Sequence, residues 1–576
     1  MNAAYGLAGI AVVVAATVLI GTLGLRISRT TSDFYVASRT VTPLRNASAI
    51  GGEYLSAASF LGVAGLILAF GADMLWLPVG WTGGYLVLLM LVSAPLRRSG
   101  AYTLPDFAEA RLESMAVRRV TSVLVVLIGW LYMMPQFQSA GLVLRTVTGA
   151  PVWAGPLLIT VVVAVNVLAG GMRSITLVQA FQYWLKLTAL AVPLVFLLLA
   201  WRFDGAPGLD RDAVPRFPER TTVTVGAAVT VSVAAPVTVT ATGRVDGRAH
   251  DGAAVTLAPG PHEIGRDTAL TFPRGAAVPH VADIPVRTDR QWGLPLDGRE
   301  HSLYATYSLI LALFLGTMGL PHVLVRFYTN PDGRAARRTT VMVLSLLGAF
   351  YLLPGVYGAL GRLYTPELLM TGRTDAVVLT LPGRVLGGLA GDLLGALVTG
   401  GAVAAFLSTS SGLTVSVAGV LGQDILRGGV RSFRAATLLA LAVPLALSVA
   451  ARSLAVADVV GLAFAVAAST FCPLLVLGIW WRRLTVAGAL AGLVTGGVLA
   501  GAAVVVTLAG GTPDGLAGAL LEQPAAWTVP IAFAAMIGVS LATPRGVPPD
   551  VARMMVRLHT PESLDVDRGT WRPKRV

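Results

Sequence analysis

Stretches of about 20 apolar residues recur along this chain, separated by short segments that contain arginine. Inside a bilayer only helices and closed barrels satisfy their backbone hydrogen bonds, and a helix of this length crosses the hydrocarbon core. Because 55% of the 576 residues are hydrophobic and only 13% are charged, we predict an all-α polytopic membrane protein. Thirteen membrane-spanning helices are expected, at residues 4–25, 46–69, 75–96, 120–147, 152–169, 175–201, 302–325, 340–363, 384–421, 436–451, 455–481, 487–508 and 526–542.

The formal net charge of +13 is explained by the position of the arginines. They cluster in every second loop, as the positive-inside rule requires of cytoplasmic segments, so the bilayer is an expected partner and nucleic acid is not. This alternation predicts a protein of the cell membrane with its N-terminus outside and its C-terminus in the cytoplasm.

Several classes of chemistry have no support in the sequence. The only lysines are Lys186 and Lys574, so a phosphate loop of the form GxxxxGK[ST] is absent from the sequence. A single cysteine, Cys472, excludes an internal disulfide, and the six histidines lack close metal-ligand spacing. With neither a nucleophile and base pair nor a cofactor motif, we expect a protein that is not an enzyme.

The span at 46–69 contains Gly51-Gly52-Glu53-Tyr54, which an ordinary membrane helix does not need. Glycines weaken a helix, and a carboxylate inside a membrane usually faces a cavity or a partner. We therefore predict a broken helix of the kind that forms transporter sites, the alternative being a close helix-packing face. A second break is expected at 316–321, GTMGLP, because Pro321 lacks a backbone N–H.

The two breaks begin two sets of five spans with opposite orientation, which predicts a 5+5 inverted repeat. The predicted units are an additional N-terminal helix and loop (1–45), the first repeat (46–201), an insertion (202–300), the second repeat (301–483), two further helices (484–543) and a basic cytoplasmic tail (544–576). In the insertion, threonine or small residues alternate with valine over 221–247, and this period of two predicts a small β-rich extracytoplasmic domain. Its role is left open, and docking of an extracytoplasmic partner is one possibility.

Residues 408–411 place four hydroxyl side chains in a row within the span 384–421. Ala405, Ser408 and Thr409 share one helical face, and hydroxyl and carbonyl oxygens suit a hard cation such as Na⁺. Bonding of these hydroxyls to their own helix is the alternative.

Three separated segments resemble the sodium:solute symporter family, most closely its acetate and short monocarboxylate branch. They are GEYLSAASFLGVAG at 52–65, GTMGLPHVLVRFYT at 316–329 and VGLAFAVAAS at 460–469, the last followed by WWRRLTVAGA at 480–489. The resemblance implies the leucine-transporter fold. It also implies a sodium site made by the carbonyls of Gly52, Leu55 and Ala405 and the hydroxyls of Ser408 and Thr409.

Two residues bear on the coupling ion. Gln179 stands where sodium-coupled sugar transporters of this family have an aspartate. Lys186 is the only lysine within a predicted span. If it points into the cation site, its ammonium replaces or repels sodium and couples transport to protons; otherwise it is a snorkelling or paired lysine.

The broken ends offer backbone N–H groups and positive dipole ends that suit a carboxylate. Candidate substrate contacts are Tyr54, Ser56, Ser59, Gln136 and Thr317, although an interhelical hydrogen bond is an equal alternative for Gln136. Candidate coupling or gating residues are Glu53, Lys186 and His322, while Arg326 is expected to be an interface anchor or gate charge.

Together these observations predict a secondary active symporter that imports a small monocarboxylate with Na⁺ by alternating access. Coupling to protons and transport of another small solute, such as proline or another amino acid, are alternatives within the family. A transporter-like membrane sensor is the alternative from another class.

Overall fold

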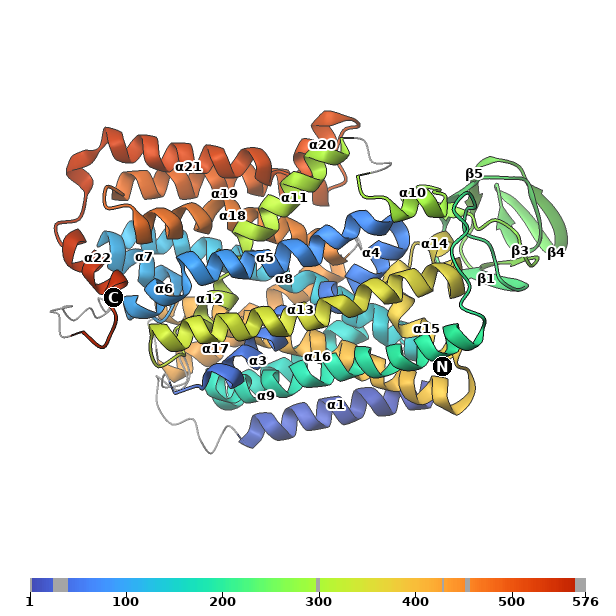
Figure 1. Cartoon of the computed structure of the whole chain (residues 1–576), viewed down its shortest axis with the longest axis horizontal. Coiled ribbons are helices and arrows are strands. Elements are labelled where there is room, and N and C mark those ends of the chain that lie inside the picture. Colours follow the sequence, from blue (N-terminus) through green and yellow to red (C-terminus); the bar gives the residue numbers. More distant parts are fainter. Residues whose placement is uncertain (1–2, 24–39, 297–300, 427–428, 451–455, 565–576) are drawn as a thin grey trace.

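The computed structural model describes residues 3–23, 40–296, 301–426, 429–450 and 456–564. They form a body of long helices that run along one direction, with a β-sheet at one end (Figure 1). Helix α1 (Ala3–Leu23) begins at the end that carries the sheet, and α22 (Val551–His559) lies at the opposite end. Parts of the predicted N-terminal loop (24–39) and of the basic tail (565–576) lie outside the described residues.

The helices before the sheet correspond to the expected first repeat. Proline at the first turn starts α3, and a capping box at Thr103 starts α7. The segment comprises α3 (Pro43–Tyr54), a π-helical turn (Ala58–Gly62), α4 (Val63–Phe70), α5 (Trp76–Leu91), α6 (Ser93–Ser99), α7 (Leu104–Leu112), α8 (Met115–Thr148) and α9 (Ala154–Phe203).

The helices after the sheet begin with α10 (Asp289–Gly293) and α11 (Ser302–Thr317). Helix α16 lies at the centre of the body, where it is buried from Val398 to Val420 and packs against α1, α8 and α9. The other helices are α12 (Pro321–Phe327), α13 (Gly333–Tyr364), α14 (Glu367–Thr371), α15 (Val377–Val385), α16 (Gly388–Val420), α17 (Val430–Ala450), α18 (Val456–Trp480), α19 (Val486–Leu508), α20 (Leu516–Glu522) and α21 (Ala525–Ala542).

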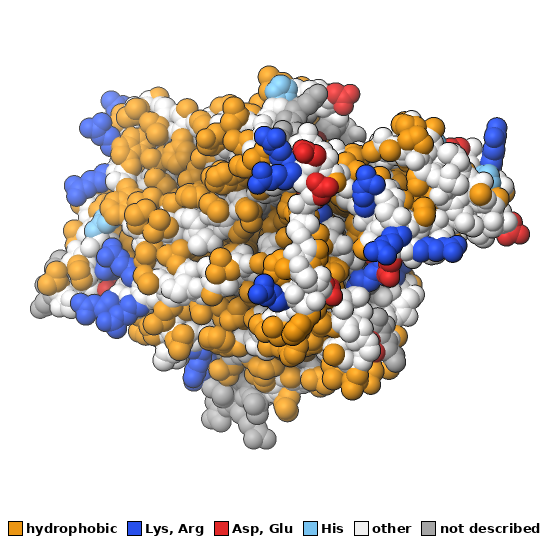
Figure 2. All heavy atoms as spheres, turned by 45° about the vertical axis from the view of Figure 1, so that its right-hand side comes forward, with side chains coloured by type: hydrophobic (Ala, Val, Ile, Leu, Met, Phe, Trp, Pro, Cys, Tyr) orange, Lys and Arg blue, Asp and Glu red, His pale blue; other side chains and the backbone are white. Residues whose placement is uncertain are grey.

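Eleven apolar helical segments in the described part of the chain are long enough to cross a bilayer. Large apolar side chains such as Val12, Phe196 and Leu352 are exposed on the body, and Figure 2 shows hydrophobic side chains covering much of its flank. The predicted number of thirteen stays a prediction. The expected spans 46–69 and 75–96 fall partly in a single apolar segment, Ala58–Leu91, within which Gly71 adopts a φ of +81°. The expected span 152–169 corresponds to a shorter apolar helical segment, Ala154–Leu168.

One expected boundary is wrong. The expected spans 152–169 and 175–201 are not separated by a turn, because residues 170–173 are helical and belong to the single 50-residue helix α9. Asn166 and Ser174, on either side of this stretch, both approach Gly21 at the end of α1, and Ser174 donates to its carbonyl over 2.7 Å. The helical backbone thus continues through Gly170 and Gly171.

Residues 221–281 form one antiparallel sheet of seven strands in the order β1-β6-β3-β5-β2-β7, with β4 paired to β3. The alternation of buried and exposed residues along β1 and β3 follows the alternation of valine and threonine. The strands are β1 (Thr221–Val225), β2 (Val229–Val233), β3 (Val237–Val245), β4 (Arg248–Leu257), β5 (Gly260–Ile264), β6 (Thr268–Phe272) and β7 (His280–Val281).

The segment after the sheet anchors it to the helical body. The Trp292 indole donates to the carbonyl of Ile67 over 2.7 Å, and Arg287 donates to the carbonyl of Phe70 over 2.8 Å. Arg362 on α13 forms an ion pair of 2.6 Å with Asp289. Trp292 and Arg287 thus donate to carbonyls in the last turn of α4, and the ion pair ties the same segment to α13.

Candidate functional site

The first broken helix is confirmed, but its break follows the glycine pair. Gly51 and Gly52 are helical in α3, which ends at Tyr54, and helical structure resumes at Ala58. A Cβ atom on Gly52 would lie 2.1 Å from the carbonyl oxygen of Gln179. The two glycines therefore allow α9 to approach α3, and the chain unwinds three residues later.

The second break is confirmed between α11 and α12, at residues 318–320. Pro321 is the first residue of α12, a position where a missing N–H costs no intrahelical bond. Gly316 and Gly319 again serve close packing, since a Cβ on either would lie 2.5 Å from a carbonyl oxygen of α18.

Lys186 on α9 points into the predicted cation site and is fully buried. Its Nζ donates to the carbonyl of Leu55 over 2.7 Å and to the hydroxyl of Ser408 over 2.7 Å, and it also donates to the carbonyl of Gly52. The structure thus places Lys186 on three of the five residues predicted to bind sodium. The interpretation of Lys186 as a snorkelling lysine is wrong.

Ala405 and Thr409, the other two residues predicted to bind sodium, lie in the same cluster but form hydrogen bonds with other residues than Lys186. The Ala405 carbonyl accepts a hydrogen bond of 3.0 Å from Ser408, and Thr409 donates to the Glu53 carbonyl over 2.6 Å. All five residues come together where the end of α3 meets α16, and their side chains are buried.

Glu53 and Arg326 form a buried ion pair with a distance of 2.6 Å between Oε2 and Nε. Arg326 is fully buried and also donates to Thr176, over 2.9 Å, and to Gln179. Arg326 is therefore not an interface anchor, and the alternative role of a gate charge stays a prediction. Gln179 in turn donates to the Ser408 carbonyl over 2.7 Å, so this network adjoins the Lys186 cluster.

The predicted substrate residues occur around the two breaks. Tyr54 shares a hydrogen bond of 2.9 Å with Thr317, which joins the two broken helices. Gln136 on α8 accepts a hydrogen bond of 3.0 Å from the backbone N–H of Ala57, next to Ser56. Ser59 shares a hydrogen bond of 2.9 Å with Tyr351 on α13. The interhelical hydrogen bond considered for Gln136 is thus present.

Aromatic side chains that the sequence analysis missed enclose this region. The ring centroid of Tyr54 lies 4.8 Å from that of Tyr85 and 6.3 Å from that of Phe464. His322 is buried with its ring 5.1 Å from that of Tyr132, and its ring nitrogens have no hydrogen-bond partner among the described residues. Trp81 and Tyr351 stack beside them at 5.6 Å. Aromatic residues are common in apolar spans, so no spacing could have distinguished these.

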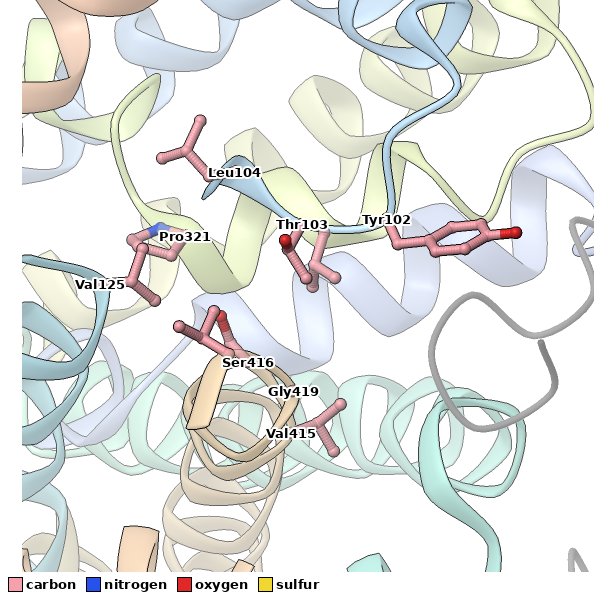
Figure 3. Close-up of a pocket in the computed structure, with 10 residues that line it drawn as sticks. Tyr102, Thr103, Leu104, Val125, Pro321, Val415, Ser416 and Gly419 are labelled. Carbon is pink, nitrogen blue, oxygen red and sulfur yellow. The ribbon is translucent and has the colours of Figure 1, made fainter. Parts of the chain in front are cut away.

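A small hollow is lined in part by α12 and α16 (Figure 3). Its free volume is about 10 Å³, which is room for about one water molecule. Its lining comes from the segment before α7 and from α7, α8, α12 and α16: Tyr102, Thr103, Leu104, Val125, Pro321, Val325, Val415, Ser416, Gly419 and Val420.

Known proteins resemble the chain over nearly its whole length. An uncharacterised symporter of Bacillus subtilis is 29% identical, with 95% of this chain and 96% of the relative aligned. A monocarboxylic acid transporter of Corynebacterium glutamicum is also 29% identical, with 93% of this chain and 92% of the relative aligned.

Two solved transporter structures have the same fold as this chain. A Na⁺-coupled sialic acid symporter in a substrate-bound, outward-open state superposes with a TM-score of 0.63 at 13% identity, over 94% of this chain and 97% of the other. A nucleobase-cation-symport-1 transporter in a closed conformation superposes with a TM-score of 0.51 at 12% identity, over 92% of this chain and 99% of the transporter.

The family model described as the sodium:solute symporter family matches residues 34–205 and 299–496, more than half of the chain. The unmatched stretch between these ranges contains the whole β-sheet. The relatives are named as transporters, and the described helices are apolar enough to cross a membrane repeatedly. This protein belongs to the sodium:solute symporter family and is a multi-pass membrane transporter of small solutes rather than an enzyme.

Proposed function

We propose that this protein imports a small monocarboxylate, of the size of acetate, propionate or pyruvate, by cation-coupled alternating access. The observation that carries the proposal is the 2.9 Å hydrogen bond between Tyr54 and Thr317, because it joins the two broken helices at a buried point. Paired breaks of this kind enclose substrate and coupling-ion sites in secondary transporters.

The chemistry around this bond suits a short carboxylic acid. Aromatic rings limit the space, while Ser56, Ser59 and Gln136 supply polar groups beside them. The helical segment that begins at Ala58 starts at the break, so its positive dipole end lies among these groups. The relative named as a monocarboxylic acid transporter supports the same substrate class.

We assign the end that carries the sheet to the outside of the cell membrane and the opposite end to the cytoplasm. The opposite end carries arginines in the loops or first turns beside α6, α8 and α13, as the positive-inside rule requires. Figure 2 shows arginine side chains gathered at that end and again near the sheet, with a hydrophobic region between them.

The coupling cation acts, in this proposal, where α3 ends against α9 and α16. Binding of Na⁺ by Gly52, Leu55, Ala405, Ser408 and Thr409 stays a prediction. It requires Lys186 to leave the oxygen atoms of Gly52, Leu55 and Ser408, to which it is hydrogen-bonded.

Uptake of labelled pyruvate into proteoliposomes tests the substrate class. We expect unlabelled acetate and propionate to compete and proline not to compete. Thr317→Val should lower the apparent affinity for pyruvate about tenfold, since one hydrogen bond to a charged group contributes about 1.5 kcal/mol. Thr160→Val is the matched control, because Thr160 bonds only its own helix at Pro156. Competition by proline with no effect of propionate would contradict the proposal.

A further inference from the structure

The hydrogen bonds around Lys186 show which protonation state of its side chain fits the observed geometry. The carbonyls of Gly52 and Leu55 can only accept, and Ser408 already donates its proton to the Ala405 carbonyl over 3.0 Å. Nζ must therefore donate three hydrogen bonds. A lysine ammonium has three N–H donors and a neutral amine has two, so this arrangement fits the ammonium.

The same atoms cannot hold a sodium ion at the same time. The three acceptors converge on Nζ, and a metal ion bound to them would occupy its position. An ammonium nearby would also repel the ion in a site where water does not screen the two charges. The described residues thus provide a positive charge at this site that is covalently attached to α9.

We propose that protonated Lys186 takes the place of the coupling sodium ion, so that this protein is a proton-coupled symporter; this inference rests on the proposed function. In the loaded state the ammonium holds the unwound end of α3 to α9 and α16. When the site opens to the cytoplasm, Nζ gives one proton to water, and the neutral amine no longer supplies three donors. Water from the outside restores the proton in the next cycle.

Charged groups near Lys186 favour transport of a proton together with an anion. Glu53 on α3 is the acidic group that acts on it, and Glu53 is paired with Arg326 on α12. With Lys186 protonated, these three side chains carry one net positive charge. A monocarboxylate neutralises this charge, and net charge is costly inside a membrane. The substrate and the proton therefore bind cooperatively, and one of each is carried per cycle without net charge movement.

Other ionisable groups on the elements packed against α9 lie elsewhere or are neutral partners. Tyr183 donates to the Leu346 carbonyl and Tyr357 to the Leu190 carbonyl. Tyr54 and Tyr351 bond Thr317 and Ser59. Helix α1 has no charged side chain between Ala3 and Leu23. The remaining charged groups on these elements are in the first two or last two turns of their helices: Arg45, Arg118, Arg119, Arg145, Arg334, Arg337, Arg338, Arg362, Arg384, Asp392, Arg431 and Arg434.

The test uses the full-length protein in proteoliposomes with labelled pyruvate. In sodium-free buffer, an inside-alkaline pH gradient should drive accumulation at least tenfold above equilibrium exchange. A sodium gradient at equal pH should drive none. Lys186→Met should abolish accumulation driven by the pH gradient, whereas Trp184→Leu, on the exposed face of the same helix, should retain it. Accumulation driven by sodium at equal pH would overturn proton coupling and leave the proposed function intact.

A second measurement does not depend on the substrate. Binding of ²²Na⁺ to the purified wild-type protein should be no greater than in the presence of excess unlabelled sodium, because Lys186 occupies the site. If pyruvate is not transported at all, the proposed function fails, and this measurement still tests the role of Lys186. Saturable sodium binding that Ser408→Ala removes would overturn the inference, and its absence would support it.

Discussion

Arg326 on α12 donates to the Glu53 carboxylate on α3 over 2.6 Å, and less than 3% of either side chain is exposed. This pair connects the two broken helices beside the cation cluster: Glu53 lies next to the break at the end of α3, and Arg326 lies in the last turn of α12. Burial of an isolated charge is costly, so each member depends on the other.

Loss of one member of this pair should be worse than loss of both. We expect Arg326→Met to destabilise the protein by about 3–5 kcal/mol, because it leaves Glu53 buried without its partner. The double variant Glu53→Gln with Arg326→Met should recover part of that loss. Thermal unfolding of four purified proteins, the wild type, Glu53→Gln, Arg326→Met and the double variant, measures this, and strictly additive shifts in Tm would refute the dependence.

A methyl group at Gly52 should disturb the site directly. In Gly52→Ala the new Cβ would overlap the carbonyl oxygen of Gln179, at 2.1 Å, and this backbone atom cannot move aside easily. We expect destabilisation by about 1–3 kcal/mol together with loss of transport. Gly348→Ala is the control, since a Cβ there meets no atom within 4 Å and alanine favours a helix. Equal melting temperatures for the two variants would contradict the expected contact.

The sheet should be removable without loss of transport. Phe217 donates its backbone N–H to the Ala276 carbonyl over 2.9 Å, so a two-residue Asn-Gly turn can join these residues in place of 218–275. Because Trp292 and Arg287 still dock on α4, we expect pyruvate uptake within about twofold of wild type, on the scale of a few tenths of a kcal/mol. Abolished uptake by a well-folded deletion variant would show that the sheet participates in transport.

The stability of the sheet should depend on pH through His262 and Asp246. Burial is the largest single effect and lowers the pKa of His262, but its hydrogen bonds to Asp246 (2.7 Å) and to the Ala258 carbonyl, together with the Asp246 charge, outweigh burial, and the pKa is raised. The hydrogen bond between the two side chains also lowers the pKa of Asp246. The pair thus stabilises the sheet when both groups are charged, and this contribution is lost as the pH rises through the pKa of folded His262 or falls through that of folded Asp246.

Amide hydrogen exchange of residues 246–264, corrected for intrinsic rates, measures this contribution at pH 6 and pH 9. Asp246 is largely exposed, so the expected loss at pH 9 is less than about 1 kcal/mol. It should be absent in His262→Asn. Protection that is equal at both pH values in the wild-type protein would argue against the pair.

Much of the helical architecture follows from the sequence because lipid imposes a simple rule on span length and polarity. Both breaks were predictable from glycine and proline, but the exact position of the first was not. Gly51 and Gly52 are helical because their missing side chains allow α9 to approach, and this tertiary contact leaves no periodic pattern. Residues 170–173 are likewise helical although they contain two glycines, and their contact with α1 is again a tertiary one that the sequence pattern does not reveal.

The site was predictable as a set of residues but not as a set of bonds. The family resemblance predicted that Gly52, Leu55 and Ser408 lie in one site, and the structure brings these residues together around Lys186. The direction of Lys186 and the pairing of Glu53 with Arg326 depend on how α9 and α12 are oriented. A single sequence does not encode these orientations in local spacing.

The covalent attachment of the Lys186 ammonium to α9 has a consequence for the environments in which the transporter works. A dissociable ion fills its site according to its concentration in the medium, whereas a side chain is present at a constant effective concentration. Salinity therefore has no direct influence on whether this charge is in place. Acidity alone sets its occupancy, so the same protein would operate equally in fresh water and in brine.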